Sequence, residues 1–154
     1  MSARAILHLC ALVLPMIPVL IWLGAMGKQF NVAGLTATLL IAAPAVLAAQ
    51  TAALLRWRAL DKRARSKQSA WPTGLGMAVL THFFFGIYLA LAFVATTGLQ
   101  EWRGDGAIWQ VPLQAIFFGI VSLGLAGAVS LPVTAWLAQV ISQRREKELA
   151  LESR

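Results

Sequence analysis

The chain has 154 residues, of which 59% are hydrophobic and only 12% are charged, and its net charge is +7. A soluble domain carries about 25% charged residues, so this composition excludes a protein that is coated by water on all sides. The single cysteine, Cys10, excludes an internal disulfide and a metal site built from several cysteines.

Four apolar stretches are each long enough to cross the hydrocarbon core of a bilayer, which takes about 20 residues. They cover residues 5–26, 33–55, 74–99 and 111–141. The last is longer than a bilayer requires, so we expect a tilt, a kink at Pro132 or an end that projects into the cytosol. The pattern predicts an all-α fold, in which a single membrane domain forms a bundle of four transmembrane helices.

The first stretch contains Pro15 and Pro18, each of which removes a backbone donor and predicts a kink. Its apolar run is longer than the 7–15 residues that are typical of a secretory signal peptide, so we expect it to be retained. A carbonyl freed by either proline could line a polar cavity or serve as a hinge.

The basic residues predict the orientation of the chain. Of the 13 lysines and arginines, all but Lys28 and Arg103 precede the first stretch, separate the second from the third, or follow the fourth. The positive-inside rule then places both termini and residues 56–73 in the cytoplasm, which requires an even number of spans. We therefore expect a multi-pass protein of the bacterial cytoplasmic (inner) membrane.

Small residues recur at helical spacing on three of the four stretches. Such residues let helix backbones approach closely, which is how helices associate in lipid. The predicted packing positions are Gly34, Thr38, Ala42, Ala45 and Ala49 on the second stretch, Gly74, Ala78, Gly86 and Ala90 on the third, and Ser122 and Ala126 on the fourth.

His82 shares one helix face with the small residues of the third stretch, so it is predicted to face a neighbouring helix. His8 lies in the same leaflet, and two such imidazoles could hold a b-type haem. The simpler interpretation is that His8 reaches the interface while His82 bonds a backbone carbonyl, Gln50 or Thr51. A proton-relay or quinone-site role for His82 is a further alternative.

No acidic residue lies inside any of the four stretches. This argues against a proton- or cation-coupled transporter, which usually needs an intramembrane carboxylate. It also argues against a small multidrug exporter, and the lone cysteine argues against a four-span thiol oxidase, which would need paired cysteines. Ser122 and Ser130 could act as nucleophiles only with His82 as the base, but helical serines commonly bond their own i−4 carbonyl instead. We predict no catalytic site and no metal site.

Residues 56–73 form a predicted basic cytoplasmic loop, and residues 142–154 a charged cytoplasmic tail that can continue the fourth helix. The tail spacing predicts ion pairs from Arg144 and Arg145 to Glu148. Clusters of basic residues beside a span bind anionic lipids, and they could also dock an acidic cytosolic partner. The predicted docking residues are Arg56, Arg58, Lys62, Arg63, Arg65 and Lys67.

These features favour a non-enzymatic accessory or assembly subunit of a larger inner-membrane complex, which packs through small-residue helix faces and acts by protein–protein interaction. The partners would be other membrane subunits or further copies of the chain, and anionic lipids, but not nucleic acid. One alternative is a redox subunit that holds haem b or a quinone through His82 and His8; the other is a small pore, carrier or immunity-type protein.

Overall fold

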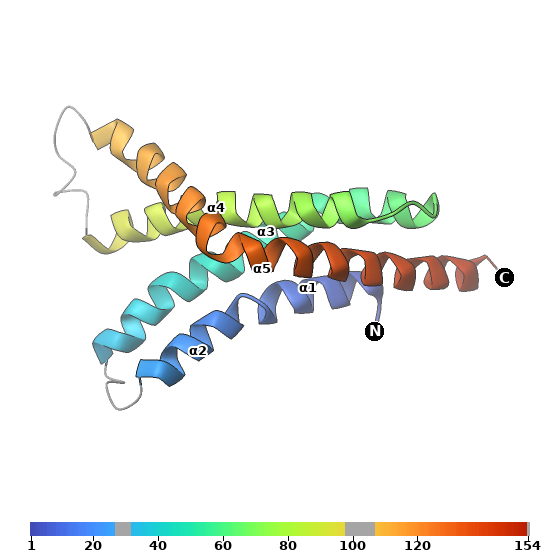
Figure 1. Ribbon diagram of the computed structural model, residues 1–154, viewed down its shortest axis with the longest axis horizontal. Coiled ribbons are helices and arrows are strands. Elements are labelled where there is room, and N and C mark those ends of the chain that lie inside the picture. Colours follow the sequence, from blue (N-terminus) through green and yellow to red (C-terminus); the bar gives the residue numbers. More distant parts are fainter. Residues whose placement is uncertain (27–31, 98–106, 154) are drawn as a thin grey trace.

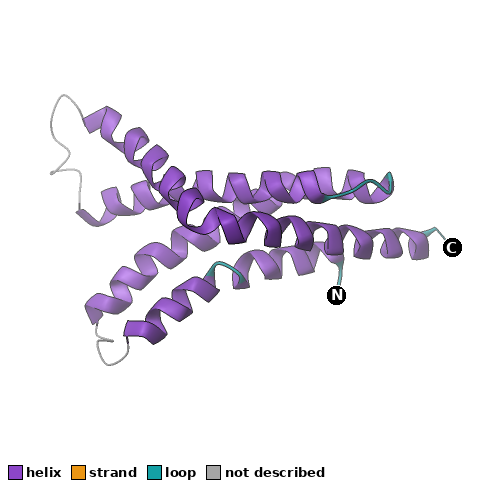
Figure 2. Ribbon diagram, in the orientation of Figure 1, coloured by secondary structure: helices purple, strands orange, loops and turns teal. Residues whose placement is uncertain are grey.

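The computed structural model describes residues 1–26, 32–97 and 107–153, and within these ranges the regular structure is entirely helical (Figure 2). In chain order the helices are α1 (Ala3–Val13), α2 (Met16–Met26), α3 (Val32–Arg65), α4 (Trp71–Thr97) and α5 (Ala107–Glu152). Lys28 and Arg103, which entered the orientation argument, lie outside the described residues.

Within the described ranges, four helical segments are long and apolar enough to cross a membrane, with α1 and α2 together counting as one. The predicted all-helical fold and the number of membrane-length helices are therefore confirmed. The N-terminus, the turn between α3 and α4, and the C-terminal end of α5 all lie at one end of the molecule (Figure 1). This end, made of residues 1–5, 56–70 and 142–153, is called the charged end below.

The first span is interrupted at Pro15, whereas Pro18 lies in the first turn of α2. The amide of Leu14 bonds the Cys10 carbonyl, and the chain resumes at Met16 after the Ile17 amide bonds the Leu14 carbonyl. Pro15 has no amide hydrogen to continue the ladder, so α1 and α2 are separate helices on either side of it.

The helix α3 does not end where the apolar stretch does, which corrects the predicted loop over 56–73. It continues to Arg65 because residues 45–70 contain no glycine or proline and are rich in good helix formers. An ion pair of 2.8 Å between Asp61 and Arg65, one turn apart, supports this extension. After the helix ends at Arg65, Lys67 has a φ of 52° and turns the chain, while the amides of Lys67 and Gln68 bond the carbonyls of Ala64 and Arg63.

The helix α5 has 46 residues and runs unbroken through Pro112 and Pro132 to Glu152. Figure 1 shows a bend part-way along α5. Pro132 lies inside this helix and removes a backbone donor, which is the cause of bending that the sequence predicts. The predicted tail from residue 142 is thus the last part of this helix.

The helix α4 packs against both α3 and α5, and α1 packs against α3 and α5. A core of buried apolar residues lies toward the charged end, where four helices meet. Its members are Ala3, Leu7, Ala53, Leu60, Ala70, Met77, Ala138 and Ile141. The opposite half of α5 carries large exposed side chains, such as Leu125 at 82% exposed, which a bilayer would cover.

Candidate functional site: polar contacts between the helices

The buried imidazole of His82 joins α4 to α5. Its Nδ1 lies 2.7 Å from the Ser122 Oγ, and its Nε2 lies 2.7 Å from the Ser130 Oγ. The serines are eight residues apart on α5, so the ring bridges about 12 Å of that helix at 1.5 Å per residue. These three residues form the imidazole–serine cluster.

A neutral imidazole has one N–H donor and one bare nitrogen, so one serine hydroxyl accepts a hydrogen bond from the ring and the other donates one. The serine that accepts from the ring keeps its own O–H, which can donate to a carbonyl of its helix, whereas the serine that donates to the ring keeps only acceptor capacity. The ring is 7% exposed, and both of its polar atoms are satisfied by protein. The cluster therefore links α4 and α5 without leaving a buried nitrogen unpaired.

Glycines bring the two backbones together around the cluster. A Cβ added at Gly86 would lie 2.1 Å from the Ala115 carbonyl oxygen, and one at Gly119 would lie 3.3 Å from the His82 carbonyl oxygen. Nearer the charged end, a Cβ at Gly74 would lie 2.5 Å from the Ala135 Cα. Only hydrogen fits at Gly74 and Gly86, so these glycines fix how closely α4 and α5 approach.

The predicted packing face of the third stretch is buried along its whole length, at Gly74, Ala78, His82, Gly86 and Ala90. Of the predicted packing positions on α3, Ala45 is half-buried and the others whose burial is described are buried. The surroundings of Gly34 lie outside the described part. The buried α3 positions are Thr38, Ala42 and Ala49. Ser122 is half-buried, and Ala126, one turn from each serine of the cluster, is exposed.

His8 bonds α3 rather than reaching the interface alone. Its Nδ1 lies 2.9 Å from Gln50 Oε1, and the Gln50 amide nitrogen donates to the His8 carbonyl at 2.8 Å. The neighbouring Thr51 hydroxyl lies 2.9 Å from the Tyr88 hydroxyl of α4. Gln50 and Thr51, which were predicted as partners of His82, therefore join α3 to α1 and to α4 instead.

The two histidines have separate partners on separate helices: His8 bonds Gln50 on α3, and His82 bonds Ser122 and Ser130 on α5. For a haem iron to bind His82, one of the serine bonds would have to break. Among the described residues, no group of three or more histidine, cysteine, aspartate or glutamate side chains could hold a metal ion.

Ser122 or Ser130 lies at the right distance from His82 for a nucleophile and its base. In hydrolytic sites of this kind the second ring nitrogen bonds an acidic group that orients the base. Here the second nitrogen bonds another serine, so the cluster has the composition of a helix–helix contact.

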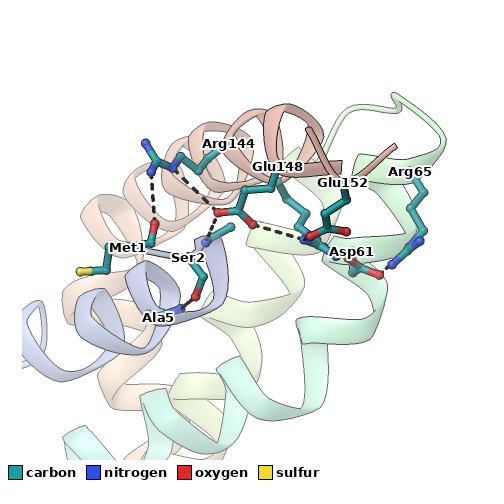
Figure 3. Close-up of polar contacts among 10 residues, drawn as sticks. Met1, Ser2, Ala5, Asp61, Arg65, Arg144, Glu148 and Glu152 are labelled. Carbon is teal, nitrogen blue, oxygen red and sulfur yellow. Dashed lines mark hydrogen bonds and ion pairs between the residues drawn. The ribbon is translucent and has the colours of Figure 1, made fainter. Parts of the chain in front are cut away.

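The charged end holds a second polar cluster, which ties the two chain termini together (Figure 3). The Arg145 guanidinium contacts Asp61 of α3 at 2.8 Å, Glu152 at 2.9 Å and Glu148 at 3.3 Å. Glu148 also accepts a hydrogen bond of 2.7 Å from the Ala3 amide, where a carboxylate complements the N-terminus of α1.

The predicted pairs within the tail, from Arg144 and Arg145 to Glu148, are present at 3.9 Å and 3.3 Å. Sequence reasoning missed the tertiary contacts of the same residues. The one available signal was Asp61, the single acid in a strongly basic segment. Partial burial opposes ionisation of Asp61, but hydrogen bonds from Arg145 and Arg65 outweigh it, so the pKa of this carboxyl lies below its ordinary value.

A third polar contact was also missed. The Gln139 side chain of α5 accepts a hydrogen bond of 2.8 Å from the Ala70 amide, immediately before α4 begins. It thereby satisfies one of the free amides at this helix start.

Comparison with protein families, with curated proteins and with solved structures found no match to this chain.

Proposed function

We propose that this protein is a non-enzymatic accessory or assembly subunit of a larger membrane complex. One observation carries the proposal: α5 presents small residues on a face that none of the described residues covers. Gly124 and Ala128, one turn apart, are both exposed, and a Cβ added at Gly124 would meet no atom within 4 Å. With Val121 and Leu125 they make up the outward face of α5.

A helix that faced only lipid would gain nothing from a small residue, because acyl chains pack equally well on bulky side chains. Exposed small residues at i and i+4 allow the backbone of another helix to approach closely. The most apolar window of α5 is only 6% buried within the described chain, against 11% for the first span and 33% for the windows of α3 and α4. This difference supports a partner helix on α5.

The polar side chains within the spans support the same function. His82, Gln50 and Thr51 all bond side chains of other helices, so they serve to hold the bundle together. Such contacts hold the helices in one arrangement, so that the outward face of α5 has a fixed position for binding a partner helix.

We further propose that both termini and the turn after α3 face the cytoplasm of a bacterial inner membrane. The support is that the described basic residues lie at the charged end, nearly all of them in the end segments of α1, α3 and α5, and the positive-inside rule assigns such an end to the cytoplasm. Labelling of a cysteine placed at Ser66 in a Cys10→Ala background tests this orientation. If an impermeant thiol reagent labelled the cysteine at position 66 from outside intact cells, the proposed orientation would be contradicted.

Affinity purification from native membranes in mild detergent tests the accessory function. The wild-type chain is expected to retain a defined membrane protein, and Gly124→Leu is expected to lose it while keeping the stability of the isolated chain, because the site is open. The matched control Ile120→Leu, at an exposed bulky position of the same helix, should retain the partner. Equal retention by Gly124→Leu and the control would contradict the proposal.

A further inference from the structure

The six predicted docking residues are not equivalent in the structure. Arg65 is paired with Asp61, and the described carboxylates Glu148 and Glu152 are bound by Arg144 and Arg145. These pairs use up most of the negative charge at the charged end. Arg56 and Arg63 make no ion pair within the described part of the chain.

Arg56 and Arg63 lie seven residues apart, so they occupy one face of α3, and that face meets the start of α4. The Arg63 guanidinium donates a hydrogen bond of 2.8 Å to the Ser69 carbonyl. The Arg56 guanidinium lies over Gly76, where an added Cβ would be 2.8 Å from Nη2 and 3.2 Å from Cζ. Arg56, Arg63, Ser69 and Gly76 define the arginine seam.

The depth of the seam suits a lipid headgroup. Arg56 directly follows the apolar run of α3, so it lies where the hydrocarbon would end and phosphates begin. Leu55 beside it is 59% exposed, and Leu75 and Val79 next to Gly76 on α4 are 41% and 47% exposed. An acyl chain of a phospholipid could cover these leucines and the valine while the phosphate of the same lipid contacts the Arg56 guanidinium.

We propose that the arginine seam binds the phosphate of an anionic phospholipid. Arg56 contacts the phosphate through its planar fork of N–H donors, which matches phosphate geometry better than a lysine does. Arg63, about two turns nearer the cytosol, adds positive charge. Arg65 contributes less, because its guanidinium is held in an ion pair with Asp61.

Spin-labelled lipids in liposomes that contain the reconstituted protein test the proposal. The wild type should associate more strongly with phosphatidylglycerol than with phosphatidylcholine. Arg56→Gln and Arg63→Gln should each reduce this preference about fivefold, as expected for about 1 kcal/mol per basic residue at a membrane surface. The matched control Arg65→Gln removes the same charge and should change the preference less than about twofold.

Two further variants separate the seam from a diffuse surface charge. Gly76→Ala keeps every charge but displaces the Arg56 guanidinium, so it should weaken the preference for phosphatidylglycerol. Arg56→Lys keeps the charge but not the planar fork of donors, so its preference should lie between those of the wild type and Arg56→Gln. The proposal is overturned if the wild type shows no preference, if Arg65→Gln matches Arg56→Gln, or if Gly76→Ala has no effect. Millimolar inorganic phosphate should not raise the thermal stability of the detergent-solubilised protein, and a rise lost in Arg56→Gln would assign the seam to a free anion instead.

Discussion

The two faces of α5 use small residues in opposite ways. On the face toward α4, Gly119 and Ala135 lie against the α4 backbone, and Ser122 and Ser130 bond His82. On the outward face, Gly124 has only open space around it. One face is closed by the chain itself, and on the other no described residue covers Gly124.

The comparison shows that a small residue in a membrane-length helix marks a possible close approach without identifying the neighbour. What distinguishes the closed face is polar complementarity, because a histidine on one helix meets serines on the other. In lipid an unpaired polar group costs several kcal/mol, so such pairs select one register between two helices. The outward face lacks this signal, so its residues do not identify the partner that we propose there.

The largest expected effect is at the tightest contact of the closed face. Gly86→Ala should destabilise the protein by about 3 kcal/mol, because the new methyl group meets the Ala115 carbonyl and the backbones must separate. Unfolding in mixed micelles containing increasing SDS measures this change. Gly124→Ala, the same substitution on the outward face, should leave the free energy of unfolding unchanged.

If the two alanine variants had equal stability, the distinction between the faces of α5 would not hold. A loss of stability in Gly124→Ala alone would mean that the outward face is covered in the folded chain.

The next effect concerns the imidazole–serine cluster. His82→Ala should cost roughly 1–3 kcal/mol, since it removes two inter-helix hydrogen bonds and leaves a space between α4 and α5. His8→Ala removes one side-chain contact to Gln50 and should cost about 0.6 kcal/mol. The same SDS titration measures both. A larger loss of unfolding free energy in His8→Ala than in His82→Ala would contradict the conclusion that His82 makes the stronger contact between helices.

The haem alternative is tested with the same two variants. A Soret absorption band in the purified protein that disappears in both variants would favour a redox subunit over the accessory function, because each histidine would then hold the iron. The accessory account predicts identical absorption spectra for the wild type and the variants.

The smallest effect is at the charged end, where water competes for the ion pairs. Asp61→Asn should cost about 0.5–1 kcal/mol at neutral pH. Because the pKa of Asp61 is lowered in the folded chain, its contribution is complete above the ordinary aspartate pKa and is lost as the pH falls through the lowered value. Thermal unfolding of the two proteins should therefore differ at pH 7 and converge in acid. A difference that grew in acid would contradict the contacts of Asp61.

The helices could be predicted because their signal is local. Apolar run length indicates a membrane-length helix, and i, i+4 spacing places Gly74, His82 and Gly86 on one face without knowledge of any other helix. The extent of α3 was missed because charge was taken to mark a loop, whereas arginine, lysine and alanine favour helix as readily as leucine does.

The partners within the site could not be predicted, because they depend on the register between helices that are far apart in the sequence. His82 was on the right face, yet its expected partners Gln50 and Thr51 lie on α3 and bond His8 and Tyr88. Sequence spacing also could not show that Ala126, between the two serines, is exposed. Each of these outcomes follows from how α4 and α5 are positioned, and no single helix contains that information.

Photo-crosslinking in native membranes tests the two-faced account of α5 most directly. A benzoylphenylalanine in place of Ala128, on the outward face, is predicted to form an adduct with a second protein, whereas one in place of the exposed Val133 is predicted to label lipid only. Adducts with the same protein from both positions, or from neither, would contradict the account.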